Sequence, residues 1–88
     1  MNHSFEQKMD SQKTIAQLKI DEPATIKGYT SEEIPVKLYE LGLLPGAQIV
    51  LKKRLPFGGP ICVQMTENQN LIALRKSEAN SILIESHL

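Results

Sequence analysis

Apolar and polar residues alternate over two stretches in the middle of the chain, a pattern that predicts β-strands. In residues 61–66, Ile61, Val63 and Met65 are expected to point inward. In residues 47–55, the inward face is expected to carry Ala47, Ile49, Leu51, Lys53 and Leu55. Two neighbouring strands of this kind can bury one face against a core and leave the other in water.

Three further segments complete the predicted sheet. Residues 71–75 follow a hairpin turn at 67–70 and return beside the preceding strand, while 24–29 form the first strand and 81–85 the last. Five short strands with closely spaced turns are typical of a small barrel. The chain is therefore predicted to be mainly β, with one inserted α-helix and one or two short helical turns.

The inserted helix is predicted in the segment that begins at Ser31. Ser31 is a suitable N-cap, and Pro35 must lie in the first turn, where its missing N–H costs little. Ile34, Leu38 and Leu41 follow a helical spacing that places them on one face.

A tight corner is expected to end this helix. Gly42 fits the position after the C-cap, where a positive φ is needed, and Leu43 would then contact Leu38 in a Schellman motif. Pro45 and Gly46 next fit the central positions of a type II turn. The residues predicted to build the corner are Leu38, Leu41, Gly42, Pro45 and Gly46.

Shorter features lie near the two ends of the chain. Thr14 is the expected cap of one helical turn, with Ile15 directed inward, and Ser77 is the expected cap of another. Residues 1–12 are polar and aperiodic and are expected to be a flexible tail. Residues 13–88 are then a single domain.

Composition narrows the function classes. The 88 residues carry no net charge and no Trp, which disfavours nucleic-acid binding. Cys62 is the single cysteine, so an intrachain disulfide is excluded and a reducing, cytoplasmic setting is expected. No stretch has the length of a membrane span or the character of a secretory signal, so a membrane role is expected to come through a partner. Weak self-association through strand edges is compatible with this composition.

No catalytic or metal-ligand set is visible in the sequence. His3 and His87 lie near the ends, and neither they nor Cys62 forms a ligand motif, so no dedicated metal site is expected. The two histidines could hold a divalent ion adventitiously. The chain also lacks a phosphate-binding loop, and an enzyme is not expected.

In its order of motifs the chain resembles the FeoA family, ferrous iron transport protein A. The resemblance covers about residues 14–85 and rests on "TIAQL", "IKGY", "KLYELGLLPG", the P-x-G-x-P loop at 56–60 and "NLIALRKSEANSILIE". It implies an SH3-like β-barrel and a cytosolic accessory role beside FeoB, a membrane ferrous-iron transporter with a cytoplasmic GTPase domain. The chain departs from the family pattern at Asp21, where a Gly is frequent, and at Gly59, where an acidic residue is frequent.

A binding surface is expected where apolar residues cannot all face the core. The predicted helix and corner carry apolar side chains on every side, so some must lie at the rim, either sealing the barrel or contacting a partner. Between residues 49 and 76 five basic residues face one acid, which indicates either a solvated edge or an acidic docking surface. The candidate partner-binding residues are Tyr39, Leu43, Leu44, Phe57, Lys52 and Arg54.

Two function classes remain in competition. The first is a protein-interaction module that binds FeoB. The second is a transition-metal-binding or metal-sensing domain similar to the C-terminal barrel of iron-dependent repressors.

Overall fold

The computed structural model describes residues 12–31 and 35–87, which form one six-stranded antiparallel sheet with three short helices. The strand order is β1-β6-β2-β3-β4-β5, and every neighbouring pair is antiparallel. The strands are β1 (Lys13–Thr14), β2 (Pro23–Tyr29), β3 (Gln48–Arg54), β4 (Ile61–Met65), β5 (Leu71–Leu74) and β6 (Ile82–Ser86). The helices are the 3₁₀-helix η1 (Ile15–Gln17), α2 (Val36–Glu40) and α3 (Lys76–Asn80).

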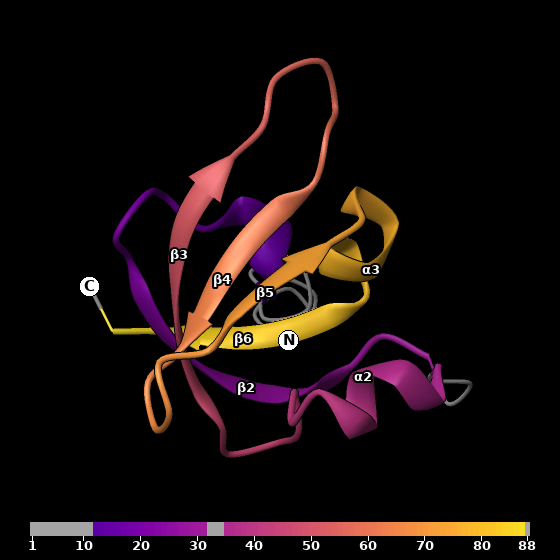
Figure 1. The fold of residues 1–88 in the computed structure, drawn as a ribbon. Helices are drawn as coiled ribbons and strands as arrows, with labels where there is room; N and C mark the ends of the chain where they lie inside the picture. The colour runs from indigo at the N-terminus through magenta and orange to yellow at the C-terminus, as the bar shows by residue number, and fades with distance from the viewer. Residues whose placement is uncertain (1–11, 32–34, 88) are drawn as a thin grey trace, which may run out of the picture.

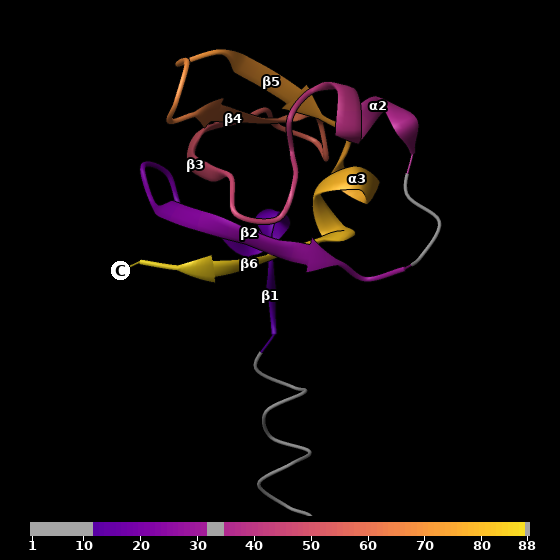
Figure 2. The same ribbon diagram turned by 90° about the horizontal axis from the view of Figure 1, so that it is seen from below.

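The sheet is strongly curled, so that its two halves face each other. Figure 1 shows the strands wrapping around the interior, and Figure 2 shows β2 and β6 in one layer with β4 and β5 in the other. The mainly β, barrel-like fold is confirmed, although the sheet stays open and a two-residue sixth strand, β1, joins the predicted five.

The core forms on the inward faces of the strands, largely as the alternating pattern predicts. Ile61, Val63 and Met65 are buried along β4, and Ile49 and Leu51 along β3. Leu18, Ile26, Leu38, Leu43, Leu74 and Ile82 are also among the fully buried side chains. Aliphatic residues thus supply most of the buried area, as expected for a chain without Trp.

One prediction for β3 is wrong. The alternation places Lys53 and Leu55 on the inward face, but both are exposed. The pairing with β4 shifts register between Leu51 and Lys53, which is a β-bulge. A bulge inserts one residue, so the side chains beyond it no longer alternate in phase with those before it.

The inserted helix is shorter than predicted. It begins at Val36 with Pro35 as N-cap, so Ser31 does not cap it. Leu38 is buried as expected, but Leu41, predicted on the same face, is 39% exposed because the helix ends there. Ile34 lies outside the described residues.

The short turns near the chain ends are partly as predicted. Thr14 is the N-cap of η1, with Ile15 buried, but α3 is capped by Arg75 and not by Ser77.

Of the predicted tail, residues 1–11 lie outside the described part of the chain, as does His3. Within the described ranges, no helix is both long and apolar enough to cross a lipid bilayer.

Candidate partner-binding surface

The corner after α2 has the predicted hydrogen-bond pattern of a Schellman motif. The Leu43 N–H donates to the carbonyl of Leu38 at 3.1 Å, and the Gly42 N–H donates to that of Tyr39 at 3.0 Å. Gly42 has a φ of +87°, which glycine adopts without steric cost. Leu38 and Leu43 are both fully buried, so the motif fixes the helix end to the core.

The following turn attaches the corner to β2. The Ala47 N–H donates to Leu44 O at 2.9 Å and Gly46 has a φ of +95°, as a type II turn requires. The Gly46 N–H donates to Ile26 O, and the Ile26 N–H donates to Ala47 O, each at 2.8 Å. The backbone of the corner is therefore held at both its helix and its strand side.

Two tyrosines connect α2 to the sheet. The hydroxyl of Tyr29, on β2, donates to the carbonyl of Leu43. Its ring lies 6.0 Å from that of Tyr39, centroid to centroid, at an interplanar angle of 47°. Burial, with a smaller contribution from Tyr39, raises the pKa of Tyr29, so its hydroxyl stays protonated and able to donate at neutral pH.

An ion pair fixes the other side of α2. Lys37 Nζ lies 2.8 Å from Glu78 Oε2 on α3. Burial alone raises the pKa of Glu78, but the hydrogen bonds from Lys37 and from the Arg75 N–H outweigh it, and the net pKa lies below its usual value. The carboxylate is therefore charged at neutral pH and pairs with Lys37.

Four large hydrophobic side chains remain exposed on α2 and the corner. They form the helix–corner surface, which consists of Val36 (67% exposed), Tyr39 (48%), Leu41 (39%) and Leu44 (38%). Leu43, predicted to contact a partner, is instead fully buried and is removed from the candidate set, because its place in the Schellman motif directs it into the core. Leu41 was expected to face inward, and Val36 was not among the candidate partner-binding residues, but both side chains are exposed.

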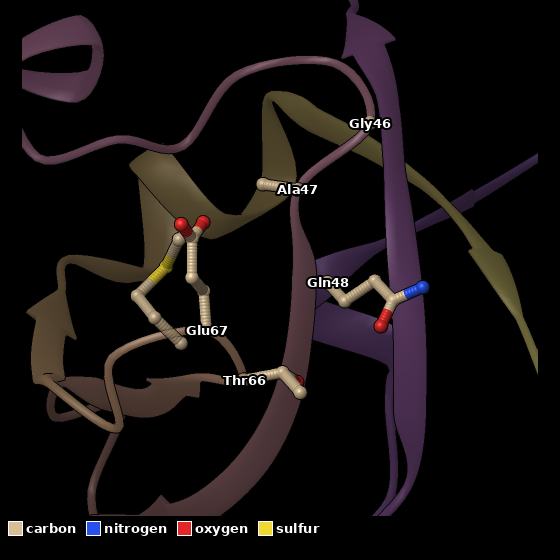
Figure 3. Close-up of a pocket in the computed structure, with 6 residues that line it drawn as sticks. Gly46, Ala47, Gln48, Thr66 and Glu67 are labelled. Carbon is tan, nitrogen blue, oxygen red and sulfur yellow. The ribbon is translucent and has the colours of Figure 1, made fainter.

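A small pocket of about 220 Å³ opens beside the corner. It is lined by Gly46, Ala47, Gln48, Met65, Thr66 and Glu67. Figure 3 shows the side chains of Gln48 and Glu67 pointing in different directions. Because its polar groups do not converge on one point, the pocket has the form of a surface hollow.

The loop between β3 and β4, predicted to be part of the same surface, lies elsewhere. Figure 1 shows this connection at the end of the molecule opposite α2. Phe57 at its tip is fully exposed and has a φ of +60°. Phe57 therefore cannot share one compact surface with Tyr39 and Leu44.

The two basic candidates on β3 already have partners within the chain. Lys52 Nζ lies 3.2 Å from Asp21 Oδ1, and Arg54 Nη2 donates to the carbonyls of Ala16 and Leu18. Arg54 thus satisfies backbone carbonyls at the end of η1 that would otherwise need water. Both side chains are still exposed, so their charge can act on a partner.

The sequence analysis did not predict that an acidic residue, Glu22, is buried. Glu22 is only 3% exposed; its carboxylate accepts from the Lys19 N–H at 2.7 Å and from the Ser86 hydroxyl. The Ser86 hydrogen bond, followed by that from Lys19, lowers the pKa of Glu22. The residue ties the turn after η1 to the last strand. Only a fold that brings residues 22 and 86 together gives it this role.

The metal-ligand candidates do not assemble in the described part of the chain. His87 Nε2 is hydrogen-bonded to Thr25 Oγ1, and Cys62 is half-buried on β4. Over residues 12–31 and 35–87, no three His, Cys, Asp or Glu side chains gather as a metal site would require.

The chain is similar to known proteins in both sequence and fold. A family model for the FeoA domain matches residues 13–86. The FeoA-like protein from Clostridium acetobutylicum shares 27% identity over 88% of each chain, with a TM-score of 0.76. FeoA of Stenotrophomonas maltophilia, a zinc complex described as a prokaryotic SH3 domain protein, shares 24% identity over 83% of this chain and 89% of its own, with a TM-score of 0.68.

The same fold occurs in a larger regulator. A manganese-dependent transcriptional repressor matches with a TM-score of 0.76 and 14% identity over 86% of this chain but 37% of its own. None of the curated proteins gives a significant match. Because the family model covers most of the sequence and the fold is SH3-like, the chain belongs to the FeoA family, which is associated with ferrous iron transport.

Proposed function

We propose that this protein is a cytosolic accessory of ferrous iron transport that binds the cytoplasmic GTPase side of the membrane transporter FeoB and catalyses no reaction itself. The observation that carries the proposal is the helix–corner surface, in which four apolar side chains stay exposed on an element held by hydrogen bonds on both sides. A rigid apolar surface loses little entropy when a partner covers it, which favours protein binding. Membership of the FeoA family supplies the transport context.

A related structure supports an accessory role. The Stenotrophomonas maltophilia FeoA is described as a candidate activating factor of bacterial ferrous iron transport. An activating factor needs a surface for the transporter and no active site of its own. The exposed apolar side chains of the helix–corner surface are available for such a contact.

The test is a titration of the full chain with the cytoplasmic domain of FeoB, followed by NMR chemical shifts. The largest shifts are expected at Val36, Tyr39 and Leu44. Leu44→Ser should weaken binding at least about tenfold, the loss expected for one well-buried aliphatic contact. Leu71→Ser is the matched control, because Leu71 is an exposed leucine on β5 outside the surface. Absence of binding at high micromolar concentration, or equal losses for both variants, would contradict the proposal.

The competing function is transition-metal binding, which the fold shared with the manganese-dependent repressor brings into consideration. An anaerobic Fe(II) titration separates the two. Stoichiometric binding that survives replacement of His3 and His87 would favour the metal-binding function. Weak binding that disappears with those residues would leave the interaction module as the better description.

A further inference from the structure

The β3–β4 loop has an apolar tip, and basic residues lie where the loop joins the sheet. Residues 55–60, here called the apolar tip, contain no charged or hydrogen-bonding side chain. Five of these six residues are exposed, and Phe57 is fully so. Figure 1 shows the loop extending beyond the rest of the sheet, where no other element covers it.

The backbone holds Phe57 outward at a steric cost. The Leu55 N–H donates to Pro60 O, and the Gly59 N–H donates to Pro56 O, each at 3.1 Å. Within this closed loop Phe57 has a φ of +60°, a region that bulky residues rarely occupy. Strain of this kind is concentrated at functional sites in proteins, and here it holds an exposed aromatic side chain outward.

Strand register gathers basic residues at the base of the tip. Arg54 pairs with Ile61, and Ile61 pairs with Leu74, so the basic residues that follow β5 lie at the same end of the sheet as those that end β3. This basic collar consists of Lys52, Lys53, Arg54, Arg75 and Lys76, all exposed. The nearby carboxylates are fewer: Asp21 pairs with Lys52, and Glu78 pairs with Lys37.

We propose that the apolar tip and the basic collar bind the surface of an anionic phospholipid bilayer, with Phe57 inserted at the level of the head groups. Phe is among the side chains that enter the boundary between head groups and acyl chains, and basic residues just behind it are attracted to anionic lipids. A lipid surface fits this arrangement because the charged side chains of the collar are all basic and the tip in front of them carries only apolar side chains. The proposal revises the expectation that membrane contact comes only through a partner, and it does not depend on binding to FeoB.

The chain offers a direct probe because it contains no Trp. Phe57→Trp introduces a single fluorophore at the tip, and Tyr39→Trp introduces one at the helix–corner surface as a matched control. With vesicles of phosphatidylcholine and phosphatidylglycerol, the emission of Phe57→Trp should shift to the blue and that of Tyr39→Trp should stay unchanged. Vesicles of phosphatidylcholine alone, or a high salt concentration, should abolish the shift, because screening removes the attraction of the collar.

Vesicle sedimentation of the full chain then separates the tip from the collar. Phe57→Asn should reduce binding at least about tenfold, since Asn tolerates a positive φ but has no ring to insert. Lys53→Gln combined with Lys76→Gln should reduce it about tenfold or more, whereas Lys27→Gln, an exposed lysine on β2 outside the collar, should change it little. An unshifted emission of Phe57→Trp would overturn the proposal. Equal binding to neutral vesicles would also overturn it. So would a titration in which the FeoB domain shifts the NMR signals of Phe57 while the chain fails to sediment with vesicles.

Discussion

Gly42 and Asp21 both have a positive φ, but only one of them is free of steric cost there. Gly42, at +87°, ends α2 and lacks a Cβ, whereas Asp21, at +67°, carries one. Asp tolerates this region better than most residues because its short side chain bonds locally. The role of Gly42 could be predicted from the sequence, because a glycine directly after an apolar helical segment is typical of a helix C-terminus.

Gly42→Ala should lower the free energy of unfolding by about 1–2 kcal/mol, the cost of a Cβ in the left-handed region. The added Cβ would meet only Met65 Cε at 3.8 Å, an ordinary contact, so conformation and not crowding causes the loss. Gly28→Ala is the control, since no atom lies within 4 Å and its φ is not in that region. Urea denaturation measures both variants. Equal losses would show that the corner does not depend on the φ of Gly42.

At the scale of elements, the sequence predicted the strands and the corner well but the helix and β3 only in part. The Leu38–Leu43 pairing followed from local rules for helix ends. The bulge that exposes Lys53 has no local signal, because it depends on how β3 pairs with β4. The exposure of Leu41 likewise depends on the helix ending at Glu40 and not on its spacing from Leu38.

Truncation of the two helix leucines distinguishes their environments. Leu38→Ala should cost about 2–5 kcal/mol of stability, because it leaves a cavity in a closely packed core. Leu41→Ala should cost less than about 1 kcal/mol, since the side chain already contacts water. Thermal or urea unfolding followed by circular dichroism is a sufficient measurement. If both variants lost equal stability, Leu41 would be packed and the helix–corner surface would be smaller than described.

Over the whole molecule, the contacts that sequence reasoning missed are those between distant segments. Glu22 accepts a hydrogen bond from Ser86, and Lys37 pairs with Glu78 on another helix. Neither pairing has a signature in the chain, because each residue looks like an ordinary surface residue in its local context. The candidate surface was divided for the same reason: Phe57 and Tyr39 are both exposed aromatic residues, but the β3–β4 loop and α2, which carry them, lie at opposite ends of the molecule (Figure 1).

Glu22 makes stability depend on pH in the acid range. Its pKa is lower in the folded state than in the unfolded chain, so the carboxylate contributes stability above the unfolded pKa of about 4.3. That contribution is lost as the pH falls through the folded pKa. Glu22→Gln should therefore be less stable than the parent at pH 7, and the difference should narrow below about pH 4. Unfolding curves at pH 3, 4 and 7 test this, and a difference that does not vary with pH would contradict it.

The separation of the two surfaces predicts independent behaviour. Leu44→Ser should weaken binding to the FeoB domain and leave vesicle binding unchanged, and Phe57→Asn should do the reverse. Variants at distant sites usually have additive effects. The double variant should therefore lose as much FeoB-domain binding as Leu44→Ser alone and as much vesicle binding as Phe57→Asn alone. Sedimentation and titration of the three proteins measure this. A loss of both activities from either single change would indicate one shared surface.

The tightness of the β3–β4 loop constrains how this end of the protein can be redesigned. A Cβ at Gly59 would lie 3.0 Å from both Leu55 Cβ and Pro56 O, so a larger residue forces the turn to widen. An acidic substitution there would alter the shape of the tip together with its charge. Exchange of Gly59 is therefore expected to succeed only together with changes in its neighbours from Leu55 to Pro60, whereas the exposed side chain of Phe57 can be replaced on its own.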